Sequence, residues 1–319
     1  MAGKRFDVIG IGHILVDMLV RAEESLLTEL KLKKGHFTLV DEQRMQEISR
    51  HIQGLTAEMA AGGSVPNTIA GIAYLGGSAG FVGKVGDDAF GEFLREGCIA
   101  QGMHHRMPKM GRLTGRAIGF ITPDSERTFA THLGASCHIT KGDIVEEDIR
   151  DSKVLHLSGY ELESRELRET CIHAMDIAQR HKVRISIDLA DPGVIGRNKA
   201  DLDGIVRKYA DIVFLNEEEA AAFTGLPAEQ AVVALGEYAE IAVLKRGKEG
   251  SLINDHGAII MIAGVQANAV DTTGAGDMYA AAILYGITHG MPLEEAGNLA
   301  SRMAAKVVEQ VGARLKRIT

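Results

Sequence analysis

Short apolar runs alternate with longer amphipathic stretches along most of the chain. Runs rich in Val, Ile, Leu and Phe predict buried strands at residues 6–12, 79–83, 153–157, 184–189, 211–215 and 241–245. Helical patterns lie between them, for example at residues 67–75, 89–101 and 162–181. Because this alternation is typical of βαβ units, the sequence predicts an α/β fold with a parallel sheet and helices on both faces.

Two stretches depart from this alternation. Residues 15–40 hold two strand-like runs around a short helical insert, and residues 107–131 resemble a hairpin that turns at Pro123-Asp124-Ser125. We expect these strands to pair as a small second sheet, spanning approximately residues 14–42 and 105–131, and to form a mobile lid over a site. No internal repeat or linker divides the chain, so residues 1–319 are predicted to form one domain with an inserted lid.

Composition and charge narrow the functional classes. Apolar residues make up 45% of the 319 positions and charged residues 24%, as in an ordinary globular protein. A net charge of −8 disfavours a nucleic-acid surface. The sequence has no signal-peptide core and no apolar run of the ~20 residues that a membrane span needs, and its cysteines are widely spaced. We therefore expect a cytoplasmic protein that binds neither nucleic acid nor membranes.

The segment Asp271-Thr-Thr-Gly-Ala-Gly-Asp277 precedes an Ala-rich run that favours a helix. Its glycines would then lie at the amino end of that helix, where free N–H groups and the helix dipole attract phosphate. A carboxylate beside a phosphate site suggests an alcohol between the two: Asp277 would take the hydroxyl proton while the amides stabilise the transferring phosphoryl group. The alternative is a Gly-rich turn capped by Thr273, without a chemical role.

This segment resembles the carboxy-terminal signature of the PfkB (ribokinase-like) family of carbohydrate and nucleoside kinases. The family's other motifs follow in the expected order at Gly12–Asp17, Gly62–Asn67, Glu126–Thr128, Asn216–Glu219 and Gly247–Gly250. The amino-terminal third is similar to the adenosine-kinase-like branch. The resemblance implies a three-layer α/β/α fold with a mainly parallel central sheet and a small β lid, and an ATP-dependent kinase.

The resemblance also implies roles for single residues. Asp277 would be the catalytic base, Gly274, Ala275 and Gly276 the anion hole, and Arg127 a lid residue that moves toward the phosphates. Substrate contacts are implied at His13, Asp17, Gly63, Ser64 and Asn67, and nucleotide contacts at Asn216, Lys245, Gly247, Gly250, Thr273, Gly274 and Gly276. Glu219, with Asn216, would hold Mg²⁺ through water, and Asp271 and Thr273 fall where some members bind a monovalent cation such as K⁺.

We expect the acceptor to be a sugar or ribonucleoside with a free primary hydroxyl next to a vicinal diol. Phe37 and Leu39, two residues apart in a strand, would project from one lid face and cover it. His13 stands where the family has Asn; it can donate to a hydroxyl as Asn does but is larger and titratable, and the alternative is a histidine tucked at a strand end. A different functional class is a sugar- or nucleoside-sensing protein without turnover. Exposed lid strands also suggest a homodimer.

Overall fold

The structure is a computed structural model that describes residues 3–124 and 126–315, except for the side chain of Phe37. Its largest element is a nine-stranded sheet of order β16-β15-β14-β13-β12-β11-β1-β5-β7. Neighbouring strands are parallel except at β14–β15 and β15–β16. The bounds are β1 Phe6–Ile11, β5 Ala79–Val82, β7 His104–Arg106, β11 Ser152–Ser158, β12 Arg184–Asp188, β13 Ile212–Asn216, β14 Ile241–Lys245, β15 Gly250–Asp255 and β16 Ala258–Ala263.

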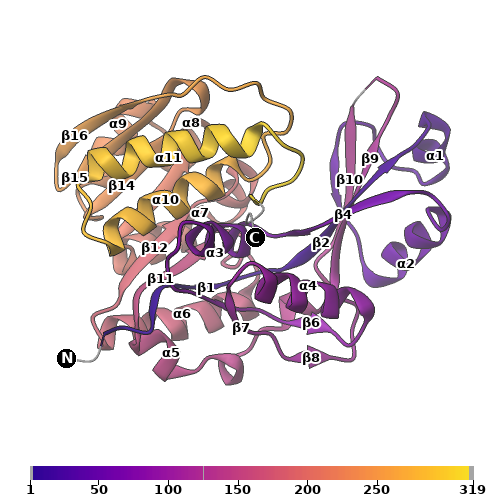
Figure 1. The fold of residues 1–319 in the computed structure, drawn as a ribbon, viewed down its shortest axis with the longest axis horizontal. Helices are drawn as coiled ribbons and strands as arrows, with labels where there is room; N and C mark the ends of the chain where they lie inside the picture. Colours follow the sequence, from indigo (N-terminus) through magenta and orange to yellow (C-terminus); the bar gives the residue numbers. More distant parts are fainter. Residues whose placement is uncertain (1–2, 125, 316–319) are drawn as a thin grey trace.

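Helices cover both faces of this sheet, as expected (Figure 1). One face packs against α3 (Ser64–Tyr74), α4 (Ala89–Ala100), α10 (Ala275–Thr288) and α11 (Leu293–Val308). The other packs against α5 (Glu146–Arg150), α6 (Arg165–Arg180), α7 (Pro192–Tyr209), α8 (Glu217–Thr224) and α9 (Ala228–Leu235). The apolar strand residues lie between these layers, and the predicted three-layer α/β/α fold is confirmed. No helix in the described part of the chain is long and apolar enough to cross a membrane.

A second sheet stands apart from the first, at the right of Figure 1. This small sheet has the order β3-β10-β9-β2-β4. Its strands are β2 Leu15–Arg21, β3 Phe37–Leu39, β4 Ala57–Gly62, β9 Gly115–Ile121 and β10 Arg127–His132, and it packs against α1 (Glu24–Glu29) and α2 (Glu42–His51). Val20, Met45 and Phe120 are among the residues of its own apolar core.

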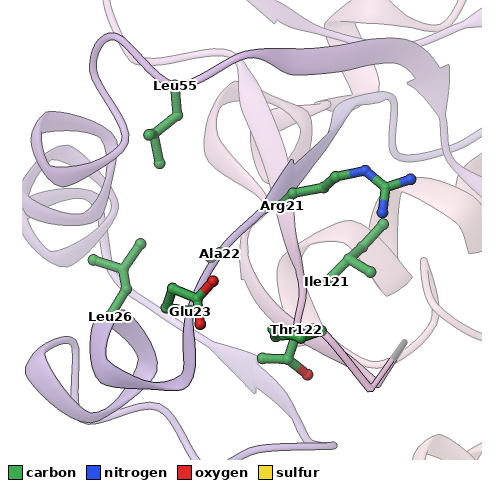
Figure 2. Close-up of a pocket in the computed structure, with 8 residues that line it drawn as sticks. Arg21, Ala22, Glu23, Leu26, Leu55, Ile121 and Thr122 are labelled. Atoms are coloured by element: carbon green, nitrogen blue, oxygen red, sulfur yellow. The ribbon is translucent and has the colours of Figure 1, made fainter.

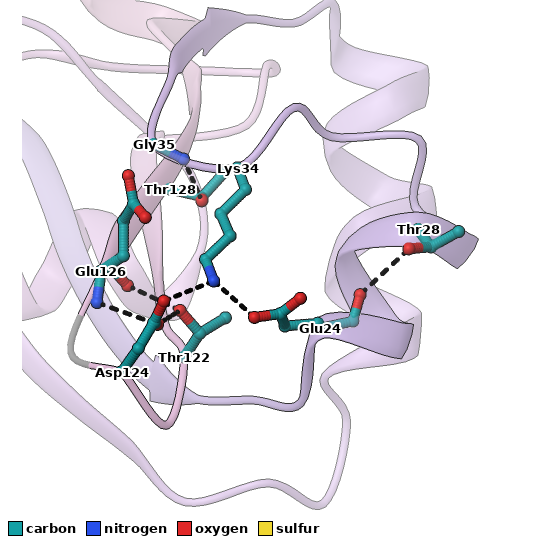
Figure 3. Close-up of polar contacts among 8 residues, drawn as sticks. All are labelled: Glu24, Thr28, Lys34, Gly35, Thr122, Asp124, Glu126 and Thr128. Carbon is teal, nitrogen blue, oxygen red and sulfur yellow. Dashed lines mark hydrogen bonds and ion pairs between the residues drawn. The ribbon is translucent and has the colours of Figure 1, made fainter.

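Polar contacts hold the tip of the small sheet together. Lys34 pairs with Glu24 of α1 and with Asp124 in the turn after β9, and Asp124 also accepts from the Thr122 hydroxyl at 2.6 Å (Figure 3). The insert before β3 is therefore tied to the β9–β10 hairpin. Ser125, the last residue of the predicted turn, lies outside the described residues.

The boundaries expected for the lid need two corrections. Strand β4 belongs to the small sheet although residues 57–62 carry no strand pattern; it pairs with β2, where Asp17 lies opposite Ala60. Residues 105–106 do not belong to it, since β7 pairs with β5 at the edge of the large sheet. Lys109–Met110 (β8) pairs instead with Val85–Gly86 (β6).

The strand order of the large sheet reverses between β1 and β11. In open α/β sheets, ligands bind beyond the carboxyl ends of strands near such a switch point. His13 follows β1, while Asp188, Asn216 and Lys245 end β12, β13 and β14. The fold thus gathers polar residues from distant parts of the sequence at one edge of the sheet.

Candidate active site

A cavity of about 280 Å³ lies at the carboxyl ends of β12–β14, beside the start of α10. It contains most of the residues predicted to bind nucleotide, together with the predicted base. The lining residues are Ser64, Asp188, Ala190, Asn216, Glu219, Lys245, Gly247, Gly276 and Asp277.

Helix α10 begins at Ala275 without a side-chain cap. Its N-cap is Gly274, with φ of 78°, and an added Cβ would lie 2.5 Å from the Ala313 Cβ, so this turn requires glycine. The Thr273 hydroxyl donates to Asp271 Oδ1 at 2.6 Å instead of capping the helix. Thr273 therefore does not cap the helix, and this part of the alternative interpretation is wrong.

The amino end of α10 offers free donors. Within the described residues, the N–H groups of Gly274, Gly276 and Asp277 have no acceptor, whereas the Ala275 N–H donates to the Thr272 carbonyl at 3.3 Å. Free N–H groups at a helix start form a site for a phosphate or a developing negative charge. Of the three residues expected to form an anion hole, Gly274 and Gly276 thus have a free N–H group and Ala275 does not, while the Asp277 N–H is also free.

Asp277 is held by two hydrogen bonds from α3. Ser64 Oγ donates to Asp277 Oδ1 at 2.7 Å, and Asn67 Nδ2 donates to Oδ2 at 2.9 Å. Burial raises the pKa of Asp277 to about 6, against the lowering effect of these two bonds. A carboxylate with a pKa slightly below neutral is ionised at pH 7 and still takes up a proton readily, which suits a general base.

The cavity holds more carboxylates than cations. Lys245 Nζ donates to Asp188 Oδ2 at 2.7 Å, and an added Cβ on Gly276 would lie 3.3 Å from that nitrogen. Burial alone would lower the pKa of Lys245, but Asp188 and Glu219 outweigh it and raise the pKa. Burial, and then the charge of Asp188, raises the pKa of Glu219 to about 7. The ammonium group therefore stays charged next to the free amides of α10.

Asn216 and Glu219 bind each other. Asn216 is the N-cap of α8, and Glu219 accepts from its backbone N–H at 2.8 Å and from its side chain at 2.6 Å. Within residues 3–124 and 126–315, no group of three or more His, Cys, Asp or Glu could hold a metal directly. Glu219 and Asn216 therefore supply oxygen ligands at this place without forming a closed metal cage.

Arg127 reaches from β10 to the loop before α10. Its Nη1 donates to Asp271 Oδ1 at 3.2 Å, and Oδ1 also accepts from the N–H and hydroxyl of Thr273. Asp271 Oδ2 accepts from the Gly312 N–H at 3.1 Å. Burial would raise the pKa of Asp271, but the bonds from Thr273 and Gly312 lower it. The Asp271 carboxylate thus already has its donors and a cationic partner.

Asp17 lies on β2 beside the end of β4. Burial raises the pKa of Asp17 to about 6, and an added Cβ on Gly62 would lie 2.2 Å from its Oδ2. The following Gly63 has φ of 104°, and a Cβ there would lie 2.3 Å from the His13 carbonyl oxygen. The Gly62-Gly63 pair therefore lets the chain pass between the two predicted substrate residues.

The contacts of His13 fix its neutral tautomer. The Ser136 hydroxyl donates to the Leu133 carbonyl at 2.6 Å, so its oxygen accepts from His13 Nδ1–H at 3.1 Å. In the neutral ring, Nε2 then carries no proton and only accepts. The donation expected from His13, like that of Asn, would need a proton on Nε2. The backbone N–H of His13 donates to buried Glu161 at 2.9 Å.

Some predicted residues lie apart from this centre. Gly250 opens β15 and packs against the backbone of β16, where an added Cβ would lie 2.0 Å from the Ile262 carbonyl oxygen. Leu39 is 56% exposed on the edge strand β3, and the side chain of Phe37 lies outside the described part. Gly247 begins a short 3₁₀ helix, Gly247–Glu249, and does line the cavity.

Sequence reasoning missed three residues of the centre. Asp188 ends a buried strand just as Asn216 and Lys245 do, so the same signal could have identified it. Glu161 and Arg314 belong to no motif, and their contacts depend on how distant segments pack. Only the structure reveals these two.

A wider hollow of about 480 Å³ lies in the small sheet, between β2, α1 and the end of β9 (Figure 2). Leu26, Leu55 and Ile121 line it together with Arg21 and Glu23. None of the residues predicted to act in catalysis lines this hollow. We therefore place the active site at the smaller cavity.

A family model described as pfkB family carbohydrate kinase matches residues 33–319. The chain belongs to this family. A 5-dehydro-2-deoxygluconokinase from Geobacillus thermodenitrificans is 28% identical over 280 residues, covering 77% of this chain and 78% of that protein. The adenosine kinase from Sinorhizobium meliloti superposes with a TM-score of 0.88 and 33% identity, covering 98% of this chain and 96% of that one. A probable sugar kinase from Rhizobium etli CFN 42 superposes with a TM-score of 0.88 and 31% identity, covering 98% of this chain and 95% of that one.

These comparisons confirm the resemblance and the ribokinase-like fold. The relatives are named as kinases, which supports the catalytic interpretation over a sensing protein without turnover. The pfkB chain described here is an ATP-dependent sugar kinase in the broad sense of its family, and its partners are small molecules.

Proposed function

We propose that the chain transfers the γ-phosphoryl group of ATP to a primary hydroxyl of a small sugar or ribonucleoside, with Asp277 as the base. The position of Asp277 carries the proposal: it lies in the first turn of α10, beside the free N–H groups of Gly274 and Gly276 and in one cavity with Lys245. Such a centre has donors for a phosphoryl group and an acceptor for a hydroxyl proton.

The step is an in-line displacement. The acceptor oxygen bonds to the γ-phosphorus while the bond to the β–γ bridging oxygen breaks, and ADP leaves. Asp277 takes the hydroxyl proton, while the amides of α10 and the Lys245 ammonium stabilise the negative charge on the transferring group. Ser64 and Asn67 keep the carboxylate in place.

The charge balance of the cavity fits Mg²⁺. Asp188, Glu219 and Asp277 share the space with one lysine, and bound ATP adds further negative charge. A divalent cation would offset this repulsion and polarise the phosphates. Glu219 and Asn216 would hold it through water, because Mg²⁺ keeps several of its waters in protein sites.

The small sheet is proposed to act as the lid. Arg127 already bridges from β10 to Asp271, next to the start of α10, and from there it is placed to contact the phosphates. Closure would exclude water, which competes with the acceptor hydroxyl. The contacts of Asp271 do not fit a K⁺ ion at its carboxylate, since Arg127, Thr273 and Gly312 donate to it.

The acceptor pocket is proposed to lie between β1, β2 and α3. Asp17 can accept from two neighbouring hydroxyls, and neutral His13 Nε2 can accept from a third. Acceptor groups of this kind suit a polyhydroxyl compound. The relatives named as 5-dehydro-2-deoxygluconokinase and as adenosine kinase supply the first two compounds to test. An ATP-dependent reaction suits the cytoplasm.

The test is ATP consumption against a panel of sugars, sugar acids and nucleosides, with product mass measured by mass spectrometry. We expect one class of acceptor to gain one phosphoryl group with wild-type protein and not with Asp277→Asn. Consumption by Asp277→Asn equal to that of wild type would refute Asp277 as the base. No acceptor-dependent consumption across the panel would refute the proposed function.

A further inference from the structure

The chain after α11 returns to the active site. Gly312 donates to Asp271, and Ala313 packs so closely on Gly274 that an added Cβ there would lie 2.5 Å from the Ala313 Cβ. Figure 1 shows this last yellow segment descending from α11 toward α3, at the junction of the two sheets. The next residue, Arg314, is half-buried and contacts the residue that holds the base.

Arg314 fixes the orientation of Asn67. Its Nε donates to Asn67 Oδ1 at 2.8 Å, and Asn67 Nδ2 donates to Asp277 Oδ2 at 2.9 Å. A guanidinium has donors only, so the amide oxygen must face Arg314 and the amide nitrogen must face Asp277. The reversed amide would place its oxygen against the carboxylate, acceptor against acceptor.

The immediate partners of Arg314 are polar groups without a carboxylate, and the Cys98 thiol is one of them. Within the described residues Arg314 forms no ion pair: Nη1 donates to Gln101 Oε1 at 3.0 Å and Nη2 to the Gly62 carbonyl at 3.4 Å. The two carboxylates that its charge does reach, without direct contact, are Asp17 and Asp277. A nearby cation favours the ionised form of a carboxylate, and more strongly where water is excluded.

We propose that Arg314 is a positioning residue for phosphoryl transfer: through Asn67 it holds the Asp277 carboxylate in place, and it supplies a positive charge near that carboxylate. The segment after α11 therefore completes the catalytic centre. This inference rests on the role proposed above for Asp277 as the base.

The first experiment needs no turnover. The Asp277 carboxyl is titrated by ¹³C NMR in protein labelled at aspartate, and its signal is assigned by its loss in Asp277→Asn. We expect Arg314→Gln to raise the pKa of Asp277 above its value of about 6, because the variant removes a nearby cation and releases Asn67, whose hydrogen bond lowers that pKa. The matched control is Gln101→Leu, which removes another Arg314 contact but leaves the Asn67 bond; it should leave the titration unchanged. Equal titration curves for wild type and Arg314→Gln would overturn the proposal.

The second experiment uses an acceptor found in the panel. Arg314→Gln should lower kcat about 10–100-fold, as expected for a misplaced base, and should move the acid limb of kcat to higher pH with KM for ATP unchanged. Arg314→Lys keeps the charge but not the planar Nε contact. Compared with Arg314→Gln, it should return the fall of kcat at acid pH to the wild-type position, and it should recover only part of kcat itself. A lower kcat with an unmoved limb in Arg314→Gln would indicate a merely structural role and overturn the proposal.

A double variant covers the case in which Arg314→Gln fails to fold. Asn67→Leu removes the residue through which Arg314 acts, so adding Arg314→Lys to it should cost little further kcat. If Arg314→Lys loses as much activity in the Asn67→Leu background as in wild type, the relay is refuted. A wild type without turnover would refute the proposed function alone, because the NMR titration still decides the role of Arg314.

Discussion

Asp277, Asp17 and Glu219 come from three distant parts of the chain, and each has a pKa raised to between about 6 and about 7, chiefly because burial removes water from the carboxyl group. Exposed to water, carboxyl groups have a pKa of about 4 and would hold a proton only well below neutral pH. The fold thus raises the pKa of each carboxyl group by burial, and the nearby cations, Lys245 and Arg314, limit that rise. Two predictions follow from this arrangement of charges.

As the pH is lowered, kcat/KM for the acceptor should fall with a midpoint near pH 6. Asp277 and Asp17 must both be ionised, to accept the proton and the acceptor hydroxyls, and both have a pKa of about 6. As pH falls through that value both become protonated, so kcat/KM for the acceptor should fall more steeply than with a single proton. Asp17→Asn should return the limb to single-proton steepness, and Asp277→Asn should lose about 10²–10⁴-fold in kcat.

Rate profiles between pH 5 and pH 8, with nucleotide binding followed by calorimetry, check this prediction. Nucleotide affinity should be the same in wild type and Asp277→Asn at pH 7. A midpoint near pH 4, the ordinary pKa of an aspartate, would contradict the burial of both carboxylates.

Arg127 should replace a monovalent cation. Its guanidinium lies 3.2 Å from Asp271, whose Oδ1 also accepts from Thr273. We therefore expect equal activity of the wild type in K⁺, Na⁺ and choline buffers. Arg127→Met should lower kcat and acquire stimulation by K⁺, because Asp271 then lacks a cation.

The matched control is Arg21→Met, an exposed arginine of the same small sheet, which should change neither property. Activity assays at constant ionic strength measure the effect. Strong K⁺ stimulation of the wild type would contradict the assignment.

At the scale of elements, both sheets were predictable only in part. In the large sheet, strands β1, β5 and β11–β14 carry buried apolar runs that local pattern detects, whereas β7, β15 and β16 were not predicted. Strand β4, Ala57-Glu-Met-Ala-Ala-Gly62, has no alternation and few β-favouring residues; its pairing with β2 decides its structure. The start of α10 was correctly predicted because Gly274 and the Ala-rich run act locally.

Gly63 connects strand β4 of the small sheet to helix α3 on the large sheet, and we expect stability and acceptor binding to depend on it. Both Gly63 and Gly54 have positive φ, at 104° and 91°, but only Gly63 is crowded, with the His13 carbonyl oxygen 2.3 Å from an added Cβ. Gly54→Ala should therefore cost only the backbone strain of about 1–2 kcal/mol. Gly63→Ala should cost more than that and also raise the acceptor KM, because His13 and Asp17 lie beside it.

Urea unfolding and acceptor titrations compare the two variants. Both variants place an alanine at a positive φ, and only Gly63→Ala also brings a Cβ against the His13 carbonyl oxygen. Equal losses of stability would show that the contact between Gly63 and His13 relaxes freely and that this link does not constrain the pocket.

At the scale of the whole molecule, the site is assembled from contacts that sequence cannot display. The motifs identified Asp277, Lys245, Asn216 and Glu219 because each lies at the end of a recognisable strand or at the start of a helix. Arg314 lies 247 positions from Asn67, and no local pattern marks it. Its side chain reaches Asn67 only because α11 packs on α10 and β16, which directs the following segment back to the junction of the sheets.

The exposed edge of the small sheet provides the last prediction. Strand β4 pairs with β2 on one side only, and Met59 on it is 50% exposed. An unpaired strand edge with an exposed apolar side chain favours association with another strand. We therefore expect two copies to pair through β4, which would also bring two proposed lids together. Light scattering after gel filtration should show a dimer, and Met59→Lys should yield a monomer. Met261→Lys, on the edge strand β16 and 75% exposed, is the control and should leave the dimer intact, since α11 packs against that strand. A wild type that is monomeric at the highest concentration measured would refute this interface.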